Sequence, residues 1–351
     1  MAHRILVATY TDRVETLFFD SEAKSLSITS SLTVGHHPSW ITPHPDNPAI
    51  WFTALEQEDG RVVVIECNED GKGKVVGELS SEGSEPCTLV AHKGDLLIGN
   101  YGDGNVVVLP LTSSSPYLTS SKTKLTLNGS GTHEDRQLSP HPHQVVPHPT
   151  RDELFVPDLG DDKTLRLEKS PDSSSWEIRG HISYDSGSGP RHVAFYGDNV
   201  YTILELTNFV TAHKVPPLPA EPTFLISTPT KRNPLPYPND MLAAEILIPT
   251  PNERFPAPYL YVSNRNDPSA EGDTISIFSI ADDTLDLISE VATGLNHVRG
   301  MMFGGSSCEW LAVGGTKGGG VKVFQRVEGG KNLEQVAHDS SVQSPTGFAW
   351  L

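Results

Sequence analysis

The chain repeats a short structural unit about every fifty residues, and this period constrains the fold more than any other feature. Each copy contains a strand-like apolar run, a turn, and a second run of alternating apolar residues, as in residues 51–54 followed by 62–65. Turns such as Glu58-Asp59-Gly60 separate the two runs. Segments with helical periodicity are nearly absent. Repetition of short antiparallel strands at this period is typical of a β-propeller.

An anchor residue, usually a proline that opens a strand, precedes each copy. The anchors lie 47 to 58 residues apart and are Pro38, Pro86, Pro142, Pro190, Asp240, Val298 and Pro345. The N-terminal strands at 5–9 and 16–20 lack an anchored strand before them, whereas the strand that begins at Pro345 has nothing after it. Pairing these strands would complete the seventh sheet and leave no free edge. We therefore predict one all-β domain over residues 1–351, a seven-bladed β-propeller closed by its N- and C-terminal strands.

Two segments interrupt the period. Residues 113–136 are rich in serine and threonine, and residues 215–238 contain eight prolines. Because neither segment has the apolar alternation of the repeats, we expect both to be long inter-strand loops.

The charge balance restricts the partners. The chain has 44 acidic and 26 basic side chains, a formal net charge of −18, and no cluster of lysine and arginine. Binding to nucleic acid or to an anionic membrane surface needs such clusters, so we expect neither partner. A small anionic metabolite is the expected ligand. The sequence leaves open whether the protein is a monomer or a homo-oligomer.

The N-terminus turns polar before a signal-peptide core can form, and no run approaches the ~20 apolar residues of a membrane helix. The three cysteines are far apart and lack CxxC spacing, which is typical of reduced thiols. We therefore expect a cytoplasmic protein.

Innermost strands of a propeller line the central channel, so residues in matching register should form rings around it. The first ring, directly after the anchors, contains Ser39, Cys87, His143, Arg191, Met241, Arg299 and Thr346. The second ring, at the end of the next strand, contains Glu56, Asn100-Tyr101, Asp158, Glu205, Asn264-Arg265 and Gly314-Gly315. A purely structural repeat would keep one residue type at each position, and these rings do not.

Consecutive blades place four of these residues at one mouth of the channel: His143, Arg191, Glu205 and Arg265. An imidazole and a carboxylate can exchange protons, and two permanent cations can hold an anion or a developing oxyanion. We predict these four as catalytic, with either His143 or Glu205 transferring the proton. The same residue types also fit inter-blade ion pairs and a hydrogen-bonded core histidine. Six neighbours are expected to bind substrate: Asn100, Tyr101, His141, Asp158, Asn264 and Arg299.

Motifs in a fixed order resemble those of the seven-bladed lactonase family, which contains propeller-type 6-phosphogluconolactonases and fungal 3-carboxy-cis,cis-muconate lactonizing enzymes. They are Glu85-Pro86-Cys87-Thr88, Pro140-His141-Pro142-His143, Gly189-Pro190-Arg191-His192 and Ser263-Asn264-Arg265. The resemblance spans nearly the whole chain and implies that His143, Arg191, Glu205 and Arg265 are the active residues. One departure is Val298, where the family usually has a proline before the arginine.

The resemblance implies hydrolysis of an anionic sugar lactone such as 6-phosphogluconolactone. A carboxy-cis,cis-muconate cycloisomerase, which forms a lactone, would need the same anion-binding and proton-transfer groups, so that alternative stays open. A third alternative, of another class, is a non-catalytic protein-interaction propeller. The Gly-His and Trp-Asp repeat signature of that class is absent.

Metal chemistry is a weaker interpretation. His141 and His143 would face the same side of a strand, and Glu56, Asn100 and Asp158 could mimic the calcium ligands of six-bladed lactonases. Pro142 between the two histidines and the seven-fold count disfavour these sites. We expect no metal and no cofactor.

Overall fold

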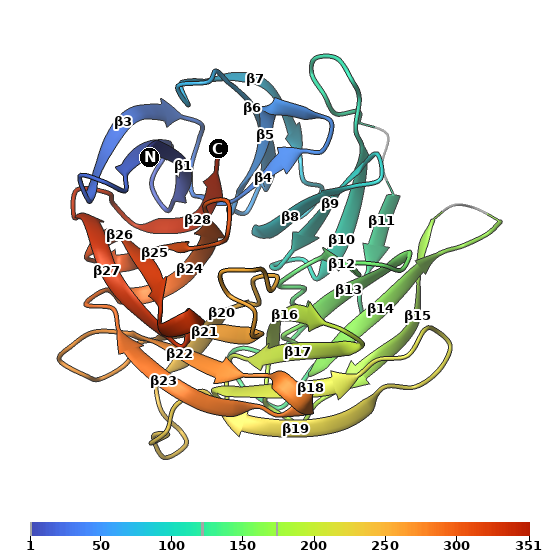
Figure 1. Ribbon diagram of the computed structural model, residues 1–351. Helices are drawn as coiled ribbons and strands as arrows, with labels where there is room; N and C mark the ends of the chain where they lie inside the picture. The colour runs from blue at the N-terminus through green and yellow to red at the C-terminus, as the bar shows by residue number, and fades with distance from the viewer. Residues whose placement is uncertain (1, 121–122, 173–174) are drawn as a thin grey trace.

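The computed structural model describes residues 2–120, 123–172 and 175–351, which form seven four-stranded antiparallel sheets arranged in a ring (Figure 1). We number the sheets as blades 1 to 7 in the order in which their outer strands follow along the chain. The predicted seven-bladed propeller is thereby confirmed.

The strands of each blade, from the innermost outward, have the following bounds. Blade 1 contains β28 (Pro345–Trp350), β1 (Ala2–Thr9), β2 (Arg13–Asp20) and β3 (Ser25–Thr33). Blade 2 contains β4 (Pro38–His44), β5 (Asn47–Leu55), β6 (Arg61–Cys67) and β7 (Gly73–Ser80). Blade 3 contains β8 (Pro86–His92), β9 (Asp95–Asn100), β10 (Asn105–Pro110) and β11 (Thr123–Thr126). Blade 4 contains β12 (Val146–Pro147), β13 (Glu153–Asp158), β14 (Lys163–Lys169) and β15 (Trp176–Ser183).

The remaining blades follow the same order. Blade 5 contains β16 (Pro190–Tyr196), β17 (Asn199–Leu204), β18 (Phe209–Lys214) and β19 (Thr223–Pro229). Blade 6 contains β20 (Leu242–Leu247), β21 (Tyr259–Arg265), β22 (Thr274–Ser279) and β23 (Asp286–Ala292). Blade 7 contains β24 (Asn296–Gly304), β25 (Trp310–Gly318), β26 (Gly320–Val327) and β27 (Asn332–Asp339). Two 3₁₀ turns, η1 (Ala281–Asp283) and η2 (Glu328–Gly330), lie in the last β–β connections of blades 6 and 7.

Blade 1 closes the ring as predicted. Its innermost strand β28 is C-terminal and pairs antiparallel with the N-terminal strand β1, so that Ile5 lies opposite Trp350 and Ala8 opposite Gly347. The two ends of the chain therefore share one ladder within blade 1, and β1 is not left as an unpaired edge.

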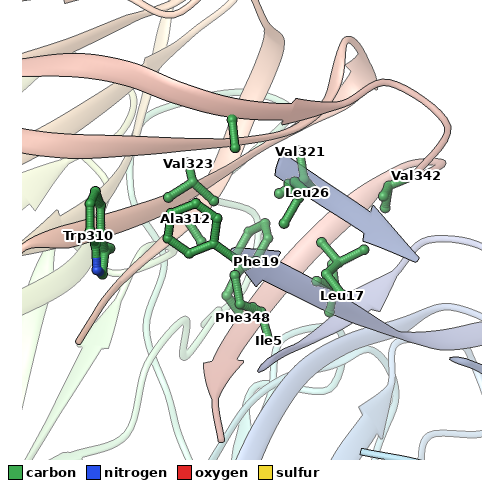
Figure 2. Packing of buried hydrophobic residues seen from close by; sticks show 12 residues of the cluster. Ile5, Leu17, Phe19, Leu26, Trp310, Ala312, Val321, Val323, Val342 and Phe348 are labelled. Atoms are coloured by element: carbon green, nitrogen blue, oxygen red, sulfur yellow. The ribbon is translucent and has the colours of Figure 1, made fainter. Parts of the chain in front are cut away.

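Apolar side chains fill the spaces between neighbouring blades. Figure 2 shows the cluster between blades 7 and 1, where Phe19 packs edge-on against Trp310 with ring centroids 5.2 Å apart. Phe348 and Val323 complete the contact from β28 and β26. Burying one such side chain contributes about 1.5–3 kcal/mol, so packing between blades holds the ring rigidly enough to position a site.

The two segments expected as loops each contain a strand. β11 lies within residues 113–136 and β19 within residues 215–238, and both are outermost strands of their blades. An outermost strand pairs on one side only, so it tolerates polar residues and terminal prolines that would disrupt a central strand. Apolar alternation is weak there for the same reason. Among the described residues, no helix is both long and apolar enough to span a bilayer.

Candidate active site

In blades 1, 2, 3, 5 and 7, a bulge next to the anchor turns one side chain of the inner strand out of the ladder. In blade 5, Pro190 pairs with Leu204 and His192 with Ile203, so Arg191 has no partner on β17. The same irregularity bypasses Arg299 in blade 7. Bulges re-aim side chains, and here they explain why Arg191 and Arg299 of the predicted first ring point out of the ladder.

Val298, the departure from the family pattern, has a local cause. Its backbone N–H donates to Asp273 Oδ2 at 2.8 Å. A proline has no N–H and could not form this bond. The bulge of blade 7 is thus fixed by a carboxylate of blade 6 instead of by a proline ring.

A second recurrent feature positions the other ring. The residue after the second strand donates its N–H to the carbonyl of the residue before the anchor: Glu56 to His37, Tyr101 to Glu85, Leu159 to His141 and Glu205 to Gly189. Glu56 and Glu205 therefore occupy equivalent positions in blades 2 and 5.

These side chains surround a cavity of about 200 Å³ at one mouth of the channel. Its lining residues come from blades 2 to 7 and from the segment before β12, and they are Glu56, Glu85, Tyr101, Arg136, His143, Arg191, Glu205, Leu242, Arg265 and Arg299. Four guanidiniums thus face three carboxylates in a protein whose net charge is −18. The cavity has room for one small molecule.

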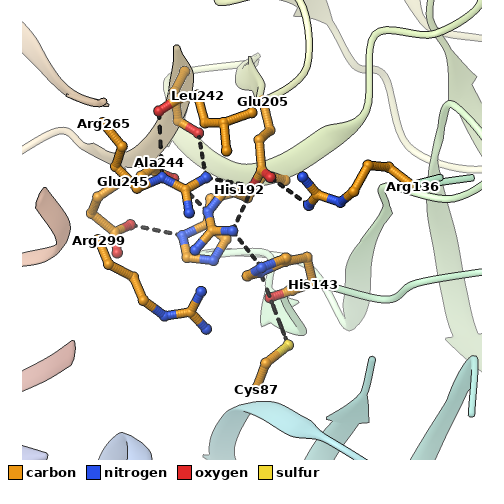
Figure 3. Close-up of polar contacts among 12 residues, drawn as sticks. Cys87, Arg136, His143, His192, Glu205, Leu242, Ala244, Glu245, Arg265 and Arg299 are labelled. Atoms are coloured by element: carbon orange, nitrogen blue, oxygen red, sulfur yellow. Dashed lines mark hydrogen bonds and ion pairs between the residues drawn. The ribbon is translucent and has the colours of Figure 1, made fainter. Parts of the chain in front are cut away.

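Glu205 lies at the centre of a network of cations (Figure 3). Its Oε2 accepts hydrogen bonds from Arg191 Nη1 at 2.6 Å and from Arg265 Nη2 at 2.8 Å. Its Oε1 accepts from Arg136 Nη2 at 2.6 Å. Burial works to raise the pKa of Glu205, but Arg265, Arg191 and Arg136 outweigh it and hold that pKa well below its usual range. Glu205 is therefore a fixed carboxylate that scarcely binds a proton.

His143 is buried beside this network. Its Nε2 lies 2.5 Å from Arg191 Nη1, and because a guanidinium can only donate, Nε2 is the acceptor. The neutral ring then carries its proton on Nδ1, which faces Cys87 Sγ at 3.9 Å. Burial, followed by the charge of Arg191, lowers the pKa of His143 well below its usual value. The imidazole is thus neutral at pH 7, and its basic nitrogen is occupied.

The opposite wall is built around Glu56. Its Oε2 accepts from the Tyr10 hydroxyl at 2.8 Å and from Arg299 Nη2 at 3.0 Å. The Arg299 guanidinium also lies over the Tyr10 ring, 5.2 Å from its centroid. Burial opposes the charge of Arg299, but Tyr10 and Glu56 outweigh burial and raise its pKa. In Figure 3, Arg299 lies outside the network around Glu205.

Several N–H groups remain available to a ligand. Among the described residues, Arg191 Nη2, Arg265 Nη1 and Arg299 Nη1 donate no recorded hydrogen bond, and none of the three is among the buried atoms that lack a partner. Donors of this kind, held by bonds at their other nitrogens, suit an anion or a developing oxyanion.

The structure brings six of the ten predicted residues to this cavity: Tyr101, His143, Arg191, Glu205, Arg265 and Arg299. Four others lie beside it. The amide of Asn100 bonds Ser81 and Asn105, and that of Asn264 bonds Thr274 and Ser276. The two asparagines thus bond residues of their own blade or directly beside it, and their side chains do not line the cavity.

Asp158 and His141 are likewise engaged outside the cavity lining. Asp158 Oδ1 accepts from the backbone N–H of His141 at 2.6 Å and of Gly160 at 3.0 Å. The His141 ring stacks on Tyr101, 4.2 Å between centroids, and its Nδ1 lies 2.7 Å from the Tyr101 carbonyl. His141 and His143 therefore do not converge, and His143 precedes the short β12 instead of lying on a strand.

Sequence reasoning missed Arg136, which comes from the serine-rich segment outside the repeat. No register argument could place it. Glu56 belongs to the predicted second ring, but the sequence assigned it no catalytic or binding role. Tyr10 precedes the first anchor, so the comparison of repeats did not include it. Among the described residues, no group of three or more His, Cys, Asp or Glu side chains is arranged to hold a metal ion.

Comparison with known proteins agrees with the family resemblance of the sequence motifs. A family model described as "Lactonase, 7-bladed beta-propeller" matches residues 4–350. A probable 6-phosphogluconolactonase of Arthroderma benhamiae is 25% identical over 98% of this chain and 88% of its own length. The 6-phosphogluconolactonase of Bacillus subtilis is 30% identical over 61% of this chain and 63% of its own length.

Among solved structures, the periplasmic gluconolactonase of Pseudomonas aeruginosa superposes with a TM-score of 0.85 over 100% of this chain and 99% of that one. At 22% sequence identity, this likeness shows the shared fold.

Proposed function

The chain belongs to the seven-bladed β-propeller lactonase family, and on that basis we propose that it hydrolyses an anionic sugar lactone, as a 6-phosphogluconolactonase does. Two relatives carry that enzyme name. Their matches cover 98% and 61% of this chain. The observation that carries the proposal is the cavity itself, in which guanidinium donors from blades 5, 6 and 7 face one small space.

Substrate binding would use those donors. The negatively charged group of the lactone pairs with Arg299, and the unoccupied nitrogens of Arg191 and Arg265 face the lactone carbonyl. A guanidinium that faces the lactone carbonyl also stabilises the oxyanion that forms when water attacks. Because most of each arginine is fixed by Glu205, by His143 or by backbone carbonyls, these donors need little reorganisation during the reaction.

His143 and Glu205 would then orient the arginines. Glu205 binds Arg191 and Arg265 together, and His143 fixes Arg191 from the other side. Removing one oxyanion donor typically lowers kcat by about 10²–10³. We therefore expect Arg265→Ala to lose activity by roughly that factor.

The test is a paired assay with 6-phosphogluconolactone and 3-carboxymuconate. The lactone, made in situ by oxidation of glucose 6-phosphate, should open faster than its spontaneous hydrolysis, and His143→Ala should slow this reaction. Turnover of 3-carboxymuconate alone would establish the cycloisomerase instead. Turnover of neither substrate, with no anion bound at the arginines, would leave the non-catalytic alternative.

A further inference from the structure

Hydrolysis of a lactone needs a group that removes a proton from the attacking water, and the two groups predicted for that task are both engaged. Three guanidiniums hold Glu205, whose side chain is 1% exposed. His143 Nε2 accepts from Arg191, and its other nitrogen carries the proton. In this arrangement the two side chains bind cations, and neither presents a free basic atom to water.

Glu56 is the contrasting carboxylate of the cavity. Tyr10 and Arg299 both bond its Oε2, so they fix the plane of the group. Among the described residues, none donates a hydrogen bond to its Oε1, and this oxygen is not one of the buried atoms that lack a partner. The side chain is 19% exposed and lines the cavity. One oxygen is held and the other is open to the cavity, which is the geometry a general base requires.

Building on the lactonase function proposed above, we propose that Glu56 is the general base that activates water. Glu56 Oε1 takes a proton from water while the water oxygen forms a bond to the lactone carbonyl carbon. The carbonyl π electrons move to oxygen, and that oxyanion is held by Arg191 and Arg265. When the carbonyl re-forms, the ring C–O bond breaks and the leaving alkoxide takes the proton from Glu56. The new carboxylic acid then loses its proton to solvent, so lactone and water give the hydroxycarboxylate and one proton.

Arg299 links this step to binding. It pairs with Glu56 through Nη2 and keeps Nη1 free for the substrate anion. A bound anion would thus sit next to the carboxylate that activates water, in one orientation set by blade 7. Tyr10 is a positioning residue, because it contacts Glu56 and does not line the cavity.

The decisive variants are Glu56→Gln and Glu56→Ala, assayed with 6-phosphogluconolactone. Gln keeps an amide oxygen that can accept from Tyr10 and Arg299, but it is not a base. General-base catalysis contributes typically 10²–10⁴-fold, so kcat of Glu56→Gln should fall by about that factor with little change in KM. Asp59→Asn is the matched control, because Asp59 is a carboxylate of the same hairpin turn that pairs with Arg61 outside the cavity. It should keep wild-type kcat.

Added formate provides a readout that a structural role would not move. In Glu56→Ala, formate should restore part of kcat in proportion to its concentration, and chloride at the same ionic strength should not. A Glu56→Gln kcat within tenfold of wild type would overturn the assignment and leave the lactonase function intact. Loss of activity without formate rescue would also overturn it and make Glu56 a positioning residue for Arg299. A wild type that does not hydrolyse the lactone would overturn both proposals.

Discussion

Glu56 of blade 2 and Glu205 of blade 5 follow equivalent strands and donate the same backbone hydrogen bond to the residue before the anchor. Their side chains enter one cavity from different blades. Glu205 is enclosed by Arg136, Arg191 and Arg265, whereas one arginine and one tyrosine share a single oxygen of Glu56. The repeat places a glutamate at the same position in both blades, but the neighbouring side chains differ. Glu205 binds three guanidiniums, whereas Glu56 Oε1 is free to accept a proton.

The free energy of unfolding should differ strongly between variants of Glu205 and of Glu56. Glu205→Gln leaves buried guanidiniums without their counter-charge, and breaking a buried ion pair costs about 3–5 kcal/mol. Glu56→Gln removes one charge from a pair whose side chains are 12% and 19% exposed, leaves one guanidinium instead of three without its counter-charge, and should therefore cost less than Glu205→Gln. Urea denaturation of both variants beside the wild type measures this difference. Equal losses in the two variants would contradict the comparison.

The stability that Glu205 contributes should depend on pH. The arginines outweigh burial and keep the pKa of Glu205 well below its usual range in the folded protein, whereas the unfolded chain protonates it near about 4.3. Its contribution is therefore fully present above that pH and is lost as the pH falls toward the folded-state pKa. The stability gap between wild type and Glu205→Gln should stay constant from pH 7 to about 5 and shrink below about 4.3. A gap that does not depend on pH would count against a depressed pKa.

Arg136→Ala should have a smaller effect on the Glu205 side. The Arg136 side chain is 31% exposed, so losing its bond to Glu205 Oε1 should cost about 1 kcal/mol or less. Since two guanidiniums remain on Glu205, the pKa of that carboxyl should rise yet stay below its usual range. The loss of stability in acid should then be smaller than in the wild type and complete at a higher pH. An unchanged acid profile would show that Arg136 adds nothing to the network.

Tyr10→Phe should have the smallest effect. It removes one hydrogen bond to Glu56 Oε2 and leaves Arg299 in place, and a single hydrogen bond contributes about 0.5–1.5 kcal/mol. On the catalytic proposal, kcat should fall by several-fold at most, and the free energy of unfolding should fall by no more than that one hydrogen bond contributes. A loss as large as that of Glu56→Gln would assign the essential role to the phenol.

The period of the sequence was enough to predict the seven blades, the closing strand and the two rings. It located Arg191 and Arg299 because each directly follows an anchor, where blades 5 and 7 have a bulge. Asn100 and Asp158 do not line the cavity, since adjacent residues of a strand face opposite sides. Their neighbours Tyr101 and Leu159 hold the positions equivalent to Glu205.

Other features depend on contacts that no repeat encodes. Arg136 reaches the cavity from a segment outside the period, and Glu56 differs from Glu205 through the side chains that surround each carboxylate. The proline-rich segment is fastened by a buried residue of blade 4, where Arg166 Nη2 donates to the Pro216 carbonyl at 2.6 Å and Nη1 to the Ala220 carbonyl at 3.0 Å. Local composition could not show that attachment.

The most direct measurement takes kcat for 6-phosphogluconolactone and the free energy of unfolding on the same preparations of wild type, Glu56→Gln and Glu205→Gln. Glu56→Gln should lose less stability than Glu205→Gln while its kcat falls by about a hundredfold or more. Glu205→Gln should lose stability as well as activity. A stable and fully active Glu56→Gln protein, or one that unfolds as readily as Glu205→Gln, would contradict the division of roles between the two carboxylates.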